Sequence, residues 1–391
     1  MKPLKSQRLH IGIFGKVNCG KSSLLNAITK QDVSIVSDIE GTTTDVVEKS
    51  MELFPLGPVN FLDTAGLDDT SELGKARIEK TLSVLNRTDV GVLVIDYNGM
   101  GDSEKQLIEK FEELNIPYCV IVNKSDIEQI SEDKVSDIEN VLITSALKDE
   151  QITDKFVDLL LKIIPDDFIN SPKIFEGLLS PKDVVILVIP VDKEAPKGRL
   201  ILPQVQAIRE LLDENCISVC VKETELEDAL KMVTPKLVVT DSQAFKKVNE
   251  LVPENILMTS FSILFARLKG DLSAFKKGIE ALPTLKPNDK ILILESCTHH
   301  NIEDDIARVK IPMLIEKRLG FKPEFEFFTG HNFPEIDKYS LIIHCGACMT
   351  NRKEVLSRIL IANKKGIPIT NYGITISYCL GILDRATKPF D

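Results

Sequence analysis

Two short segments near the C-terminus concentrate residue types that bind metals. Residues 297–300 read Cys-Thr-His-His, and residues 344–348 read His-Cys-Gly-Ala-Cys. Thiolates and imidazoles are the usual ligands of zinc and of iron–sulfur clusters, and a CxxC spacing lets one turn supply two of them. The sequence therefore predicts a metal centre held by Cys297, Cys345 and Cys348.

Three interpretations of these cysteines are open: unrelated thiols, a structural zinc ion completed by a histidine, and an iron–sulfur cluster. We favour the cluster. Three cysteines would leave one iron of a four-iron cluster with a weak or exchangeable ligand. Candidates for that ligand, or for contact with bound cargo, are His299, His300, Glu303, Asp304, Asp305 and His344.

A second group of residues, in the first quarter of the chain, has the spacing of a phosphate-binding loop. Residues 15–22 read Gly-x-x-x-x-Gly-Lys-Ser between an apolar strand pattern and a helical pattern. The glycines let backbone N–H groups approach phosphates, Lys21 reaches the β- and γ-phosphates, and the Ser22 hydroxyl ligates magnesium. From this segment we expect nucleotide contacts by Gly15, Asn18, Cys19, Gly20, Lys21, Ser22 and Ser23.

Two further segments are expected to sense magnesium and the γ-phosphate. Residues 63–66 read Asp-Thr-Ala-Gly, where Asp63 would hold magnesium through water and the Gly66 N–H would meet the γ-phosphate. In the loop 34–45, Thr43 is the expected magnesium-sensing residue, with Thr42 beside it. The predicted catalytic residues are thus Lys21, Thr43, Asp63 and Gly66, and the predicted magnesium ligands are Ser22, Thr43 and Asp63.

The base-binding residues indicate guanine. Residues 123–126 read Asn-Lys-Ser-Asp after an apolar strand pattern. The Asp126 carboxylate can accept both the N1–H and the N2–H of guanine, which adenine does not offer. Asn123 and Lys124 would brace the base and the loop, and the turn formed by Ser145 and Ala146 would meet the guanine O6. The expected nucleotide is GTP.

The order of these motifs resembles that of the translation-factor-type GTPases. Gly41-Thr42-Thr43-Thr44-Asp45 resembles the GTTRD motif of the subfamily that includes the tRNA-modification GTPase MnmE and the ribosome-assembly GTPase Era. The motif's arginine is replaced by Thr44. The resemblance implies that Asn18 holds a potassium ion; a loop-closing role is the alternative. Because Leu67 stands where Ras-like enzymes carry a water-orienting glutamine, we expect slow hydrolysis that potassium stimulates.

The elements that must position these residues alternate between strand and helix patterns along the chain. The motifs follow predicted parallel strands, and the carboxyl ends of such strands are where doubly wound sheets bind ligands. The cysteines follow two predicted strands, "ILILES" and "YSLIIH", of one late sheet, so they can converge. We expect an α/β protein with a GTPase domain (1–166), a linker (167–181), an α/β dimerisation domain (182–268) and an α/β cluster-binding domain (269–391).

Composition limits the class of protein. The chain has 391 residues, a size that favours two or three domains, and a net charge of −11, which argues against a basic nucleic-acid-binding face. No apolar run has the length of a membrane span, and we expect a cytoplasmic location. Eight cysteines in such a chain are more consistent with buried thiols or metal ligands than with disulfides. The apolar segment 262–268 is read as an interface helix or as core.

A GTPase joined to CxHH…HCxxC resembles the HydF family of FeFe-hydrogenase maturation proteins, over the whole chain. The resemblance implies a 4Fe–4S cluster on Cys297, Cys345 and Cys348 and a homodimer formed by the middle domain. It also implies that a diiron precursor arrives from HydE and HydG type radical-SAM maturases and is delivered to apo-hydrogenase HydA. GTP would govern the exchange of partners.

Two other functions remain as alternatives. One is a ribosome- or tRNA-associated GTPase with a structural zinc site, which the acidic charge and the lack of a basic and aromatic RNA surface disfavour. The other is a dimeric GTP-binding scaffold without a metal. The colour of anaerobically purified protein separates a cluster, which is brown, from zinc, which is colourless.

Overall fold

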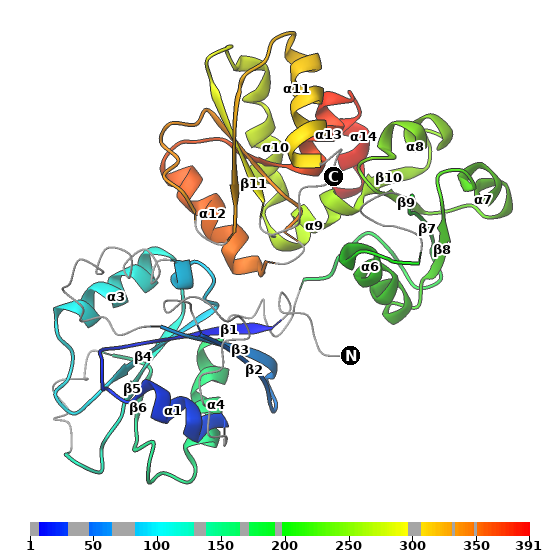
Figure 1. Ribbon diagram of the computed structural model, residues 1–391. Helices are drawn as coiled ribbons and strands as arrows, with labels where there is room; N and C mark the ends of the chain where they lie inside the picture. The colour runs from blue at the N-terminus through cyan, green and yellow to red at the C-terminus, as the bar shows by residue number, and fades with distance from the viewer. Residues whose placement is uncertain are drawn as a thin grey trace. The chain divides into compact units, whose positions relative to one another are not determined.

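The structure is a computed structural model that describes residues 8–29, 47–64, 83–128, 138–164, 172–191, 198–295, 306–330, 333–347 and 350–391. It divides into two compact units, residues 1–171 and residues 172–391 (Figure 1). The expectation of an N-terminal GTPase domain followed by further α/β structure is confirmed. No helix within these described ranges is long and apolar enough to cross a membrane.

The first unit contains a six-stranded sheet with the order β2-β3-β1-β4-β5-β6. Neighbouring strands are parallel except for β2, which pairs antiparallel with β3. The strands are β1 (Leu9–Phe14), β2 (Val47–Leu53), β3 (Gly57–Asp63), β4 (Val90–Ile95), β5 (Tyr118–Val122) and β6 (Val141–Ile143). The helices of this unit include α1 (Lys21–Thr29), α3 (Asp102–Glu113) and α4 (Ile152–Ile163).

Helices cover both faces of this sheet, as a parallel sheet requires. Strand β1 is buried along its whole length, and its alternate residues belong to two apolar clusters. Leu24 of α1 and Phe156 of α4 pack on one face, and Phe111 of α3 packs on the other. The apolar strands thus hold the loops at their carboxyl ends on a rigid base.

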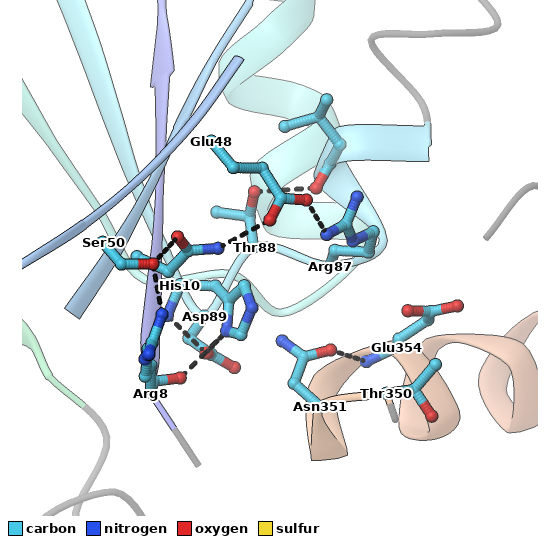
Figure 2. Close-up of polar contacts among 12 residues, drawn as sticks. Arg8, His10, Glu48, Ser50, Arg87, Thr88, Asp89, Thr350, Asn351 and Glu354 are labelled. Atoms are coloured by element: carbon cyan, nitrogen blue, oxygen red, sulfur yellow. Dashed lines mark hydrogen bonds and ion pairs between the residues drawn. The ribbon is translucent and has the colours of Figure 1, made fainter. Parts of the chain in front are cut away.

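The antiparallel edge strand β2 was not predicted from the sequence. It carries charged side chains, and a tight turn ending at Gly57 (φ 81°) connects it to β3. Glu48 forms an ion pair with Arg87, and the Ser50 hydroxyl donates to Asn60 Oδ1 at 2.9 Å (Figure 2). Polar bonds therefore hold the strand together with its pairing to β3 and the packing of Met51 and Leu53 on the core.

The second unit contains two four-stranded parallel sheets, ordered β10-β9-β7-β8 and β12-β11-β13-β14. The predicted alternation of strands and helices is confirmed, and the strands predicted from "ILILES" and "YSLIIH" are both present. The first sheet and its helices comprise β7 (Val184–Val188), α6 (Leu202–Asp213), β8 (Ile217–Val221), α7 (Leu226–Met232), β9 (Leu237–Thr240), α8 (Phe245–Leu251), β10 (Leu257–Ser260) and α9 (Phe261–Lys269).

The second sheet is preceded by α10 (Leu272–Ile279), which lies in a stretch whose sequence is mainly polar, and by a 3-10 turn at Leu282–Thr284. Its elements are β11 (Lys290–Glu295), a π-helical turn (Ile306–Lys310), α11 (Ile311–Leu319), β12 (Glu324–Thr329), β13 (Leu341–His344), α12 (Arg352–Lys364), β14 (Ile369–Asn371), α13 (Tyr372–Cys379), α14 (Leu383–Thr387) and a final 3-10 turn (Lys388–Phe390).

The two sheets of the second unit share one apolar core. A single cluster of buried residues runs from Ile186 in β7 to Ile293 in β11. Helix α9 contributes to this cluster through Ile263 and Ala266, so the segment read as interface or core is core within this unit. Part of the predicted linker packs on the first sheet, because Ile174 and Phe175 are buried in a separate apolar cluster with Val185 and Leu187 of β7.

Candidate functional site

The loop after β1 has the backbone conformation of a phosphate cradle. Gly15, Asn18 and Gly20 have positive φ angles of 146°, 64° and 96°. A Cβ atom at Gly15 would lie 2.2 Å from the Val94 carbonyl oxygen, and one at Gly20 would lie 2.1 Å from Asn123 Nδ2. Both positions therefore require glycine, and the loop closes tightly onto the neighbouring strands.

The predicted phosphate ligands lie at the start of α1. Lys21 Nζ donates to the carbonyl oxygens of Gly15 at 2.9 Å and Lys16 at 2.7 Å, so the ammonium lies over the loop. Ser22 and Ser23 are exposed in the first turn of the helix. Free N–H groups and the helix dipole favour anions at such an end. The geometry suits the binding of phosphate groups.

Asp63 ends β3 and has the environment of a cation ligand. Its Oδ1 atom is buried and has no hydrogen-bond partner in the described part of the chain. Burial raises the pKa of its carboxyl, against the opposing charge of Lys21. An orphaned buried carboxylate oxygen fits a hard cation such as Mg²⁺. Thr43 and Gly66, the other predicted residues of this function, lie outside the described residues, as do Thr42, Thr44, Asp45 and Leu67.

Asn123 joins the three loops that would surround the guanosine. Its Nδ2 donates to the Cys19 carbonyl oxygen at 3.2 Å, and its Oδ1 accepts the Ala146 N–H at 2.9 Å. Asn123 is 2% exposed, so both bonds are shielded from water. The phosphate loop, the Asn-Lys-Ser-Asp segment and the turn after β6 therefore meet as predicted.

Asp126 is held in its ionised form. The Ser145 hydroxyl donates to Asp126 Oδ1 at 2.6 Å, and Lys148 Nζ lies 3.6 Å from Asp126 Oδ2. The hydrogen bond from Ser145, aided by the charge of Lys148, lowers the pKa of the Asp126 carboxyl. An ionised carboxylate can accept two hydrogen bonds from one base edge. The contact of Lys148 with Asp126 was not predicted from the sequence, although Lys148 stands only three residues after Ser145.

Lys124 and Lys16 have partners that no motif indicates. Lys124, with φ 63°, places its Nζ 4.0 Å from Asp96 at the end of β4. Lys16 Nζ lies 2.9 Å from Glu104 Oε2, and Glu104 is 2% exposed and also accepts the Gly101 N–H. The phosphate loop is thereby tied to the start of α3.

The predicted cysteine strands are neighbours. β11 and β13 pair in parallel, and the Cys345 N–H donates to the Leu294 carbonyl oxygen at 3.0 Å. Cys345 thus lies beside the end of the strand that leads towards Cys297. Seven of the predicted metal-site residues lie outside the described residues, and their convergence stays a prediction: Cys297, His299, His300, Glu303, Asp304, Asp305 and Cys348.

The loop around Cys345 fits a thiolate ligand. The Ala347 N–H donates to Cys345 Sγ at 3.4 Å, and Ala347 adopts a positive φ of 53°. This hydrogen bond fixes the position of the sulfur within the loop. In the parts of the chain that are described, no group of three or more His, Cys, Asp or Glu side chains could hold a metal ion.

His344 is fully buried, and both of its ring nitrogens have partners. Arg358 Nη1 lies 2.9 Å from Nε2, and the Cys345 carbonyl oxygen lies 2.8 Å from Nδ1. Because a guanidinium can only donate, Nε2 accepts and Nδ1 donates. Burial, with the charge of Arg358, lowers the pKa of His344 to about 4. This geometry favours a neutral imidazole that supports the cysteine loop over one that ligates a metal.

Comparison with protein families identifies three segments. The "Hydrogen maturase F dimerization domain" matches residues 174–270, and the "Hydrogen maturase F tetramerization domain" matches residues 273–389. The "50S ribosome-binding GTPase" family matches residues 10–124. The first two matches span most of the second unit, and the third covers the phosphate loop and the strands beside it.

Similarity to individual proteins covers about two fifths of this chain in the following cases. The tRNA modification GTPase MnmE of Prochlorococcus marinus (strain NATL1A) is 39% identical over 160 residues, which are 39% of this chain and 34% of that protein. GTPase Der of Nitratiruptor sp. is 31% identical over 175 residues, 41% of this chain and 38% of that protein. The chain thus spans about a third of the length of these relatives. The structure of Era with MgGDPNP and a segment of 16S ribosomal RNA has a TM-score of 0.34 and 29% identity, and the match covers 40% of this chain and 56% of that chain.

Proposed function

Because the chain belongs to the hydrogen maturase F family, with the dimerization and tetramerization domains of that family following a GTPase domain, we propose a scaffold function for it. The protein carries a 4Fe–4S cluster and assembles or delivers the diiron subcluster of FeFe-hydrogenase under the control of GTP. The observation that carries the proposal is the placement of Cys345 after β13, hydrogen-bonded to the end of β11. That edge of a parallel sheet is where its loops form a shared crevice.

The GTPase site acts through positioning and charge. Lys21 and the first turn of α1 hold the phosphates, while Ser22, Thr43 and Asp63 hold magnesium, which neutralises charge that develops on the phosphates. The Gly66 N–H contacts the γ-phosphate, and Asp126 selects guanine. Hydrolysis is slow because Leu67 stands where Ras-like enzymes carry a water-orienting glutamine. It is faster in potassium than in sodium at equal ionic strength, because Asn18 in the phosphate loop holds potassium.

The cluster site supplies an exchangeable position. Cys297, Cys345 and Cys348 hold three irons, and the fourth iron takes a ligand from outside this set. The candidates for that ligand or for contact with the diiron cargo are His299, His300, Glu303, Asp304 and Asp305. Support comes from the Ala347 N–H that donates to Cys345 Sγ at 3.4 Å, because this bond fixes the sulfur at the carboxyl end of β13.

A scaffold that carries a diiron precursor needs proteins that supply the precursor and a protein that receives it. HydE and HydG type radical-SAM maturases supply the precursor and apo-hydrogenase HydA receives it, all in the cytoplasm. The two matched family domains are named for dimer and tetramer formation, which supports a homodimer that associates further. These same matches favour maturation over the ribosome- or tRNA-associated function, which rests only on the GTPase part.

The test is Cys345→Ala, with Cys216→Ala as the matched control. Cys216 is buried in the first sheet of the second unit and lies outside the predicted metal site. After anaerobic reconstitution, Cys345→Ala is expected to lose most of its bound iron and the EPR signal of a reduced cluster, because the site keeps at most two thiolates. Cys216→Ala is expected to retain both. Full iron and an unchanged spectrum in Cys345→Ala would contradict the assignment, and colourless wild-type protein containing zinc would replace it with a structural zinc site.

A further inference from the structure

A buried lysine contacts the cysteine loop from another element. Lys269 is in the last turn of α9 and is 5% exposed. Its Nζ donates to the carbonyl oxygen of Ala347 at 2.9 Å and to that of Thr350 at 2.7 Å. These two residues stand on either side of Cys348, so one ammonium group binds both ends of the segment that carries the second cysteine of the CxxC pair.

This placement is energetically unusual for lysine. A long side chain at a helix end can ordinarily extend its ammonium into water. Burial of that charge is unfavourable unless hydrogen bonds compensate for it. In this protein the compensating bonds include two carbonyl oxygens of the cysteine loop. The loop and the lysine therefore stabilise each other, and neither is well satisfied without its partner.

The other end of α9 also contacts the loop region. Ser262 Oγ lies 3.3 Å from Asn371 Oδ1, and Asn371 Nδ2 donates to the Cys345 carbonyl oxygen at 3.3 Å. A Cβ atom at Gly373 would lie 2.8 Å from the Ser262 Cβ, so the backbones approach closely here. Helix α9 thus lines the loop from its first turn to its last.

The loop is also anchored where it enters α12. The Thr350 hydroxyl donates to the Ala347 carbonyl oxygen at 3.2 Å, which is the oxygen that Lys269 also binds. Asn351 caps α12 by accepting the Glu354 N–H at 3.2 Å (Figure 2). The loop is fixed at its exit by these local bonds, and Lys269 connects this fixed end to α9.

We propose that Lys269 is a positioning residue for the cysteine loop, and that it links the dimerization domain to the metal site. Residue 269 lies inside the segment matched as the dimerization domain, and the loop lies inside the segment matched as the tetramerization domain. The ammonium fixes two loop carbonyls and places a positive charge against the loop, which favours any anionic centre that the loop holds. The proposal rests on the proposed function.

The experiment compares Lys269→Met, which removes the charge and the donors, with Lys269→Gln, which keeps donors without charge. Lys365→Met is the control, because Lys365 forms an exposed ion pair with Asp337 in the domain that contains the cysteine loop. After anaerobic reconstitution, Lys269→Met should release iron to a chelator about tenfold faster or more, the size of effect associated with lost charged hydrogen bonds. Lys269→Gln should release iron at an intermediate rate. Both should show a more negative midpoint potential in an EPR redox titration, and Lys365→Met should match wild type.

The same variants give the results that would overturn the proposal. A folded Lys269→Met protein with wild-type iron release and midpoint potential would overturn the proposal; if this variant does not fold, the same comparison is made with Lys269→Gln. If wild-type protein binds no cluster, the proposed function fails, and the lysine is tested by amide hydrogen exchange of residues 345–351 in the metal-free chain. Faster exchange in Lys269→Gln than in Lys365→Met supports the positioning role, and equal exchange overturns it.

Discussion

At the scale of single residues, the structure shows how short polar side chains connect loops that are distant in sequence. Asn123 bonds to Cys19 and Ala146 at once, and Ser145 orients the Asp126 carboxylate. Such bonds are shielded by the loops themselves, so removal of one partner leaves another buried group unsatisfied. The effect of a substitution here therefore exceeds the loss of a single contact with the nucleotide.

Guanine selection is expected to depend on the charge of Asp126. Asp126→Asn replaces an acceptor-only carboxylate with an amide and removes one of the two acceptors for guanine donors. Affinity for GTP should fall by about 1.5–3 kcal/mol, the range for hydrogen bonds to charged groups. Titration with a fluorescent GTP analogue measures the change, and Asp154→Asn, at an exposed position of α4, is the control. Binding of ATP by wild-type protein as tightly as GTP would contradict the guanine assignment.

At the scale of elements, a close contact between a helix and a strand holds the edge of the second sheet of the second unit in place. Gly278 in α10 packs against the backbone of β14, and a Cβ atom there would lie 1.9 Å from the Ile369 carbonyl oxygen. Thr370 donates to the Phe275 carbonyl oxygen at 3.0 Å across the same contact. Since β14 lies next to β13, α10 supports the sheet edge that carries Cys345.

The substitution Gly278→Ala tests whether close packing or helix propensity has the larger effect on stability at this position. Within a helix, alanine is favoured over glycine by about 1 kcal/mol, so propensity alone would stabilise the variant. The clash with a backbone atom that cannot rotate away should dominate, and unfolding by urea should show a net loss of about 1–3 kcal/mol. Lys277→Ala, at an exposed position of the same helix, should change stability by less than about 0.5 kcal/mol. A Gly278→Ala protein as stable as wild type would show that α10 can move away from β14.

At the scale of the whole molecule, the residues proposed to bind nucleotide and those proposed to bind a metal cluster belong to different compact units. The proposed nucleotide residues lie before residue 171, and Lys269 and the three proposed cluster cysteines lie after it. In the second unit, by contrast, one apolar core joins the sheets of the two matched hydrogen maturase F domains. Changes in the dimerization domain can therefore reach the cysteine loop through shared packing.

This division predicts that damage to the metal site spares GTP hydrolysis. Cys345→Ala should hydrolyse GTP at the wild-type rate when phosphate release is measured, because its structural effects stay within the second unit. Lys21→Ala is the opposite control, which should lose hydrolysis and keep its iron. A severalfold fall in the GTPase rate of Cys345→Ala would instead indicate that the metal site and the nucleotide site are coupled.

Much of this organisation could be predicted because local patterns report local structure. Apolar strands followed by glycine-rich or charged motifs placed the phosphate loop, Asp63 and Asp126 at the carboxyl ends of a parallel sheet, and β11 and β13 were found in the same way. The edge strand β2 was missed although Met51 and Leu53 alternate with polar residues and pack on the core, because charged residues dominate its sequence. Helix α10 was missed because its apolar Phe275 and Ile279 stand in a stretch that is otherwise mainly polar.

The sequence by itself determined which residue types stand at which motif positions, because the chemistry of a phosphate loop, a guanine-binding aspartate or a CxxC pair follows from side chains and spacing. The tertiary structure alone decided which distant groups meet. Lys269 appeared as an ordinary lysine at a helix end, and His344 as an available ligand. Packing buried both, gave Lys269 two loop carbonyls and engaged both nitrogens of His344. A buried polar group must find its partners wherever the fold brings them, and sequence distance carries no information about that meeting.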